Sequence, residues 1–266
     1  MSARSRLLDR AITIVVCVVC VLMFLPTVIF VPISFSSADF ISFPPVGFST
    51  RWYEQFFVSR AWQRAATNSI VVAVGATAVA TILGTIVSLG AMRLSQRWAR
   101  RVTLLFLLPL MMPSIVTAVA LYGGYARIGL TGTVPGLMLA HAILGLPFVV
   151  VNVLAALQKM DWHVENAARS LGASPLRAFL LVTLPMIKPG VIAGAAFAFL
   201  TSFDEVVVAL FMSGIDAVTL PVQMWNGIRF EISPAVAAVS TLLLIFSCAV
   251  MALYFSVKGT SYGQSQ

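Results

Sequence analysis

Residues 165–172 read Glu-Asn-Ala-Ala-Arg-Ser-Leu-Gly, and the chain continues through Ala173-Ser174-Pro175 to Thr183-Leu184-Pro185. This stretch is a polar, helix-forming island in a chain that is otherwise mostly apolar. Asp161 can cap a first helix by accepting a hydrogen bond from a free backbone N–H. Apolar residues then recur at spacings of three and four, which places one small stripe on a helix face, made of Val164, Ala167, Ala168 and Leu171.

The island also carries signals for a helix stop and a restart. Gly172 can adopt a positive φ without strain and so favours the end of the first helix. Ser174-Pro175 reads as an N-cap followed by proline at the first helical position. Glu165 and Arg169 stand four residues apart, in the favourable order for an ion pair. The sequence therefore predicts two short helices with a turn between them, and a small-residue face that can dock closely against a partner.

The composition around this island is that of an integral membrane protein. Hydrophobic residues make up 60% of the 266 residues, charged residues 10%, and the mean hydropathy is +0.99. Soluble domains carry roughly 25% charged residues. The net charge of +8 could suggest a nucleic-acid partner, but the Lys and Arg residues are scattered and no soluble basic domain holds them. Membrane topology explains the excess better, and we expect contact with lipids and none with nucleic acid.

The apolar segments predict an all-α fold with six transmembrane helices. A span needs ~20 predominantly apolar residues, and six runs meet this requirement: Ala11–Ile33, Ala65–Met92, Val102–Ala126, Ile128–Gln158, Pro189–Met212 and Pro234–Val257. We divide the chain into an N-terminal helix and loop (1–64), a transmembrane domain (65–257) that carries the island as a loop (159–188), and a short tail (258–266).

The distribution of basic residues predicts the orientation. If the N-terminus lies inside, twelve of the 17 Lys and Arg residues fall in cytoplasmic segments and five fall outside. Positive residues concentrate on the cytoplasmic side of membrane proteins. We therefore expect a multi-pass membrane protein with both termini and the 159–188 loop in the cytoplasm.

No motif for catalysis or for a cofactor is present. The chain lacks a Gly-x-x-x-x-Gly-Lys-Ser/Thr loop for ATP, a Gly-x-Ser-x-Gly nucleophile, a His-Glu-x-x-His zinc site and any Cys/His metal spacing. The two histidines, His141 and His163, lie on different segments, and His141 is interpreted as a polar packing contact within the fourth span. Catalysis by this chain is not expected, and no catalytic residue, metal or cofactor is assigned.

Two acidic residues inside the fifth span are the candidates for contact with a transported solute. Asp204 and Glu205 would each cost ~2.5–3.5 kcal/mol at the bilayer centre if ionised. Such residues normally face a bundle interior or an aqueous path. In a continuous helix Glu205 shares a face with Thr201 and Ser202, which predicts a polar lining for the path. Asp204 lies about 100° around the same helix and could line the path or bond a neighbouring helix; either acid could instead be structural.

The island resembles the "EAA" loop of permease subunits from binding-protein-dependent ABC importers, and the resemblance covers roughly residues 65–257. Here the loop reads Glu-Asn-Ala-Ala in place of Glu-Ala-Ala, with the Ala-Ala stripe and Gly172 in place. Residues 202–211 (Ser-Phe-Asp-Glu-Val-Val-Val-Ala-Leu-Phe) and 220–225 (Leu-Pro-Val-Gln-Met-Trp) resemble, more narrowly, the second permease of spermidine/putrescine importers.

The resemblance implies a type I importer fold, a place in the bacterial inner membrane, alternating access and a set of partners. These are two ATPase subunits that hydrolyse ATP, a second homologous permease and a periplasmic substrate-binding protein. It also implies that the loop is where an ATPase subunit docks, which assigns the coupling role to Glu165, Ala167, Ala168, Arg169, Leu171 and Gly172. Polyamines are polycations, and the acids Asp204 and Glu205 suit a cationic solute.

Two alternatives to a polyamine importer remain open from the residues. An ion-gradient-driven secondary transporter or channel would use Asp204, Glu205 or His141 as a proton relay and would need no such loop. An ABC permease could also carry an opine, an amino-acid derivative, iron or an oxyanion, because selectivity is also set by the binding protein. The identity of the partner permease and the resting conformation are not encoded in this chain.

Overall fold

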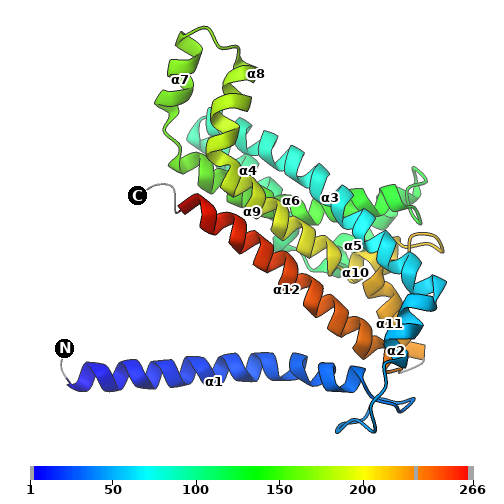
Figure 1. Cartoon of the computed structure of the whole chain (residues 1–266). Helices are drawn as coiled ribbons and strands as arrows, with labels where there is room; N and C mark the ends of the chain where they lie inside the picture. Colours follow the sequence, from blue (N-terminus) through cyan, green and yellow to red (C-terminus); the bar gives the residue numbers. More distant parts are fainter. Residues whose placement is uncertain (1–2, 231–232, 263–266) are drawn as a thin grey trace. The chain divides into compact units, whose positions relative to one another are not determined.

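The computed structural model describes residues 3–230 and 233–262, and within these residues the regular structure is helical throughout (Figure 1). The elements in chain order are α1 (Ala3–Ser34), α2 (Arg51–Val58), α3 (Arg60–Arg93), α4 (Gln96–Met111), α5 (Ser114–Ala126), α6 (Val134–Lys159), α7 (Trp162–Ser170), α8 (Pro175–Ala178), the π-helix η1 (Phe179–Thr183), α9 (Leu184–Phe203), α10 (Val207–Met212), α11 (Leu220–Phe230) and α12 (Ala235–Tyr262). The predicted all-α fold is confirmed.

The chain divides into two compact units, which are described separately. The first comprises Met1–Gln63 with Asn226–Phe246, and the second comprises Arg64–Trp225 with Ser247–Gln266. In the first unit Trp52 of α2 packs against Ala235 and Ala238 of α12. The indole Nε1 of Trp52 donates a hydrogen bond to the carbonyl oxygen of Ser36 at 2.9 Å. This bond ties α2 to the loop that follows α1.

The second unit is built around α6, which packs against α9 and α4. Small residues let α3 and α9 approach α6 closely. A Cβ on Gly84 of α3 would lie 2.7 Å from Val149 Cγ1, and a Cβ on Gly194 of α9 would lie 2.7 Å from Val149 Cα. Val149, fully buried, is therefore held between two glycines. Gly84 and Gly194 therefore serve packing within this chain.

Among the residues that the structure describes, five helices are long and apolar enough to cross a membrane, and a bent pair makes six if it counts as one span. The bent pair is α4 and α5, whose axes meet at 105°. The third span predicted over 102–126 is therefore sharply bent and is not one continuous helix. The cause is Pro113, because a residue before proline is driven out of the helical region, and Met112 is extended with φ −90° and ψ 138°.

The fifth predicted span also differs from a single helix over 189–212. A helical run of 29 residues extends from Pro175 to Phe203, so it begins earlier than expected, and it ends before the two acidic residues. A separate short helix, α10, follows at Val207. The residues of α10 pack with α5 and α6 in one apolar cluster that includes Ala118, Leu137, Val208 and Met212. Two interrupted spans therefore meet inside the second unit.

Candidate functional site

The loop between α6 and α9 has the caps and the turn that its sequence predicts, but the second helix is not short, because it continues through the π-helix into α9. The side chain of Asp161 accepts a hydrogen bond from the backbone N–H of His163 at 2.9 Å and caps α7. Gly172 has a φ of +94°, in the left-handed region that glycine enters without strain. The Ser174 hydroxyl accepts a hydrogen bond from the Arg177 N–H at 3.4 Å and caps α8. In Figure 1, α7 and α8 stand together beyond the end of α9.

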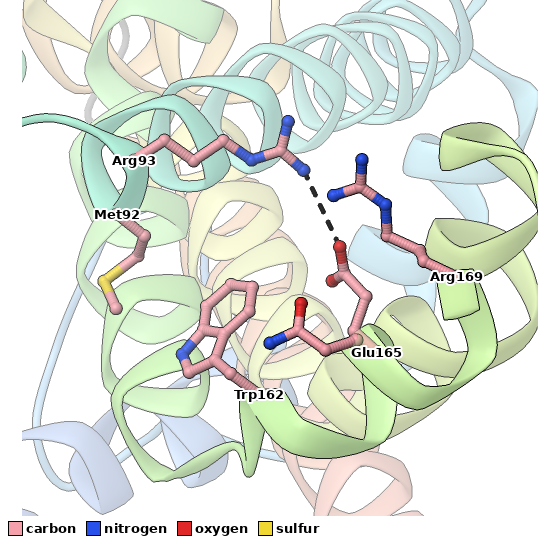
Figure 2. Close-up of a pocket in the computed structure, with 6 residues that line it drawn as sticks. Met92, Arg93, Trp162, Glu165 and Arg169 are labelled. Carbon is pink, nitrogen blue, oxygen red and sulfur yellow. Dashed lines mark ion pairs between the residues drawn. The ribbon is translucent and has the colours of Figure 1, made fainter.

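Glu165 is the one acidic residue of this loop whose side chain is buried, with 6% of its surface exposed. The hydroxyl of Thr183, itself fully buried, donates a hydrogen bond to Glu165 Oε2 at 2.5 Å. Arg93 Nη2, from the end of α3, lies 3.8 Å from Glu165 Oε1 (Figure 2). The carboxylate therefore joins α7 to the end of α3 and to the π-helix that leads into α9.

The expected ion pair between Glu165 and Arg169 is replaced by this arrangement. Arg169 lines the same cavity of about 410 Å³ as Glu165, together with Met92, Arg93, Trp162 and Asn166. The ion pair within 4.0 Å that Glu165 forms among the described residues is with Arg93. The side chain of Glu165 points inward, toward Thr183 and Arg93. Its ion-pair partner is therefore determined by the tertiary structure, and not by the four-residue spacing to Arg169.

The π-helix explains how Thr183 reaches Glu165. A π-turn adds a residue to the helical repeat and rotates the side chains that follow it relative to a regular helix. Thr183 is the last residue of η1, and α9 starts at the next position. Such turns are rare and occur often at functional sites. Nothing in the sequence around Phe179 signals it, since the stretch Phe-Leu-Leu-Val-Thr fits an ordinary helix.

The outward face of the loop is apolar. Leu171 exposes 89% of its surface and Leu176 exposes 66%. Ala167 is exposed and Ala168 is partly exposed, on the same helix that buries Glu165. Exposed apolar residues of this size are typical of surfaces that contact another protein or a membrane. We call the set Val164, Ala167, Ala168, Leu171 and Leu176 the loop face.

The second candidate region is the junction of α9 and α10, residues 204–206. The carboxylate of Glu205 accepts a hydrogen bond from the Val208 N–H at 2.9 Å, so it satisfies a free donor in the first turn of α10. Asp204 is exposed, and its carboxylate forms no hydrogen bond or ion pair with the described residues. Of the two acids, Asp204 is therefore the one left to interact with something outside this chain.

The predicted polar face of Thr201, Ser202 and Glu205 is wrong, because the helix that would align these residues ends at Phe203. Ser202 is buried, with 4% exposed, and its carbonyl oxygen accepts a hydrogen bond from Nδ1 of His141 at 3.0 Å. The same nitrogen lies 2.9 Å from Ser202 Oγ. His141 is the polar packing contact that the sequence favoured, and it ties the end of α9 to α6.

Several partners of the candidate residues were not foreseen from the sequence. Arg93 and Thr183 are far from Glu165 along the chain, and these two contacts exist only once the helices are packed. Val208 lies three residues after Glu205, so the bond between them is local and has the spacing of a helix cap.

The comparisons with known proteins agree with this architecture. Residues 80–260 match the family model described as the binding-protein-dependent transport system inner membrane component. The chain is 31% identical over 231 residues to the spermidine/putrescine transport system permease protein PotC of Haemophilus influenzae, covering 87% of this chain and 90% of the relative. It is 32% identical over 229 residues to the putrescine transport system permease protein PotI of Escherichia coli K12, covering 84% and 81%.

A solved structure shows the same fold at low sequence identity. A chain of a bacterial ABC transporter involved in the import of the acidic polysaccharide alginate superposes with a TM-score of 0.74 at 13% identity, covering 97% of this chain and 98% of that one. The helical spans, the type I importer permease fold and the match over residues 80–260 lead to one assignment. This chain belongs to the family of binding-protein-dependent transport system inner membrane components, and it is a multi-pass membrane protein.

Proposed function

We propose that this chain is the permease subunit of an ATP-driven polyamine importer, forming half of the path for a small cationic solute such as putrescine or spermidine. The observation that carries the proposal is the 31% identity over 87% of the chain to a spermidine/putrescine permease. Two ATPase subunits, a second homologous permease and a periplasmic binding protein complete the assembly. ATP hydrolysis belongs to the ATPase subunits.

The loop face supports the coupling role of the 159–188 loop. It presents Leu171, Leu176 and the Ala167-Ala168 pair on the surface, which suits insertion into a cleft of an ATPase subunit. Glu165 is buried, so its contribution to coupling is to hold α7 in place through Thr183 and Arg93. Arg169 and Gly172 complete the docking region, Arg169 as an exposed charge and Gly172 through its turn.

The junction supports the role of the acids in the path. Irregular backbone at membrane depth is tolerated where it is buried in protein or lines a water-filled cavity. The α9–α10 break is such a segment, and it carries Asp204 as an exposed and unpaired carboxylate. A negative charge there attracts a polycation, and the solute is released because a single acid does not bind it too tightly. Glu205 contributes negative potential while it caps α10.

The decisive experiment is uptake by the assembled importer. The full chain is co-expressed with the second permease and the ATPase subunits, reconstituted in proteoliposomes and supplied with loaded binding protein and ATP. We expect accumulation of radiolabelled putrescine or spermidine, together with ATPase activity that rises when the binding protein is added. Accumulation driven by an ion gradient without ATP would refute an importer of this class. ATP-driven uptake of a sugar or an oxyanion, with no polyamine uptake, would refute the assignment of a polyamine as the solute and leave the importer class standing.

The orientation is proposed with both termini and the loop in the cytoplasm. A single cysteine is placed at Ser170 or Arg97 and, as matched outer positions, at Glu54 or Ile228, in a chain without its native cysteines. A membrane-impermeant maleimide added to intact spheroplasts should label the outer pair and should label the inner pair only after lysis. Labelling at Ser170 without lysis would reverse the topology.

A further inference from the structure

Three arginines gather at the start of α4. Arg97, Arg100 and Arg101 stand at spacings of three and four and so share one helix face with Leu104. Together with Gln96 they line a surface cavity of about 610 Å³. All three arginines are exposed, and none of them lies within 4.0 Å of a carboxylate among the described residues. The cavity is thus lined by three positive charges without a counter-charge from this chain.

The surroundings suit a phosphate group held at the membrane surface. The guanidinium of Arg101 stacks on the ring of Trp98 at 4.9 Å, which orients its N–H edge while leaving it free to donate. Ser95, the N-cap residue of α4, makes no side-chain cap bond, so the N–H groups of the first turn also have no side-chain acceptor. Guanidinium groups bind phosphates through two parallel hydrogen bonds.

The depth of the cluster indicates which phosphate it meets. Directly after Arg101 the chain continues as the uncharged run Val-Thr-Leu-Leu-Phe-Leu-Leu-Pro-Leu-Met over residues 102–111. Trp98 is 55% exposed, and tryptophan favours the level of lipid headgroups. The arginines therefore lie where the hydrocarbon region ends. A basic pocket at that depth, beside an apolar helix face with exposed leucines, matches a lipid headgroup with its acyl chains.

We propose that Arg97, Arg100 and Arg101 form a binding site for the headgroup of an anionic phospholipid, whose acyl chains lie along the exposed leucines Leu104, Leu105 and Leu108 of α4. The site is separate from the 159–188 loop and from Asp204. It does not depend on which solute the permease carries. Its occupant is a membrane lipid, and an acidic surface of an ATPase subunit is the competing occupant that the test must exclude.

The test is native mass spectrometry of the full chain purified in detergent and titrated with phosphatidylglycerol or phosphatidylcholine of identical acyl chains. We expect the wild type to retain phosphatidylglycerol preferentially. The triple variant Arg97→Gln, Arg100→Gln, Arg101→Gln should lose that preference by at least about tenfold, since each basic residue at an anionic surface contributes a factor of about five. The triple Lys variant should keep part of it, because charge remains while the paired hydrogen bonds are lost.

The matched control removes three exposed arginines elsewhere, with Arg60→Gln, Arg64→Gln and Arg127→Gln, and should retain the preference. Inorganic phosphate at millimolar concentration should not displace the lipid. Equal binding of the two lipids by the wild type, or unchanged phosphatidylglycerol binding by the Arg97–Arg101 triple variant, would overturn the site. So would displacement of the lipid by phosphate alone. Loss of ATPase co-purification with unchanged lipid binding would assign the arginines to the protein partner and also overturn it.

Discussion

The 159–188 loop and the α9–α10 junction each contain a glutamate that accepts a hydrogen bond, yet they differ in what they leave for a partner. In the loop, Glu165 is buried and the exposed surface is apolar, as at Leu171. At the junction the apolar residues are packed and a carboxylate, Asp204, is exposed. We propose that the first region meets a protein surface and that the second meets a charge. The predictions below test this contrast, beginning with the largest effect.

Placing a charge on the loop face should have the largest consequence. Leu171→Asp should reduce co-purification of the ATPase subunit at least about tenfold. The variant would have to bury a charge in an apolar contact, and changes at interface hot spots cost at least about 2 kcal/mol of binding free energy. Leu171 is exposed, so the chain should still fold and insert. The measurement is pull-down of the ATPase with the tagged permease.

A control of equal exposure is available on a different segment. Ile215 exposes 91% of its surface in the loop between α10 and α11, and Ile215→Asp should leave the ATPase bound. If both variants retain the ATPase, the loop face is not the docking surface. If both lose it, the effect comes from general damage and the contrast between the regions fails.

The inner side of the loop should respond to loss of the acceptor more than to loss of the charge. Glu165→Ala leaves the buried Thr183 hydroxyl without its partner, at a cost of ~1–3 kcal/mol. Glu165→Gln keeps an oxygen acceptor and loses only the ion pair with Arg93, whose side chain is 65% exposed, and exposed pairs contribute ~0–1 kcal/mol. Hydrogen exchange of the 162–178 segment should rise strongly in the alanine variant and little in the glutamine variant.

Thr183→Val tests the same hydrogen bond from the donor side. It removes the donor while keeping the volume, so it should loosen the same peptide and add little when combined with Glu165→Ala. Equal exchange in Glu165→Ala and wild type would mean that the bond to Thr183 does not hold α7. A strong increase of hydrogen exchange in Glu165→Gln would instead mean that the ion pair with Arg93 contributes most to holding α7 in place.

At the junction, charge should matter more than structure. Asp204→Asn should lower polyamine uptake about fivefold, the change expected when roughly 1 kcal/mol of attraction to a cation disappears. Glu205→Gln should have a smaller effect, because the amide oxygen can still accept the Val208 N–H. Uptake by proteoliposomes is the measurement, and Asp216→Asn is the control, since Asp216 is an exposed acid paired with Arg64 at 3.7 Å. Full uptake by both junction variants would make the two acids structural.

The smallest effect is expected from Ser202→Ala. Its hydroxyl is lost, but His141 Nδ1 keeps its bond to the Ser202 carbonyl oxygen, so stability should fall by ~1 kcal/mol or less. Thermal denaturation monitored by loss of monodisperse protein should show a slight shift, with uptake unchanged. A loss of uptake as large as that of Asp204→Asn would return Ser202 to the solute path.

The two regions also differ in how far the sequence could predict them. The loop was readable because Asp161, Gly172 and Ser174 act on their immediate neighbours. At the junction, Phe-Asp-Glu-Val contains neither glycine nor proline, so no local signal stops the helix at Phe203. Glu205 caps α10 through a local bond to the Val208 N–H, whereas the packing of α10 against α5 exists only in the folded chain.

The third span is an intermediate case. The sequence Met112-Pro113 carried a bend signal, but it lay inside a continuous apolar run that satisfied the length of a membrane span. Hydropathy indicates how apolar a segment is, but it does not indicate whether the helix axis bends within that segment. The contacts of Gly84 in α3 and Gly194 in α9 with Val149 of α6 join residues far apart in the chain, so only the structure shows them.

One uninterrupted helical run, from Pro175 to Phe203, connects the 159–188 loop to the α9–α10 junction. At 1.5 Å per residue its 29 residues form a rod about 43 Å long. An axial displacement at the loop end is therefore delivered to the residue before Asp204. The π-helix near the start of this rod holds one residue more per turn than its surroundings. Converting that turn to a regular helix would rotate the rest of the helical run by about 100° about its axis. The same segment can therefore transmit a movement along its axis and determine which side chains face the α9–α10 junction.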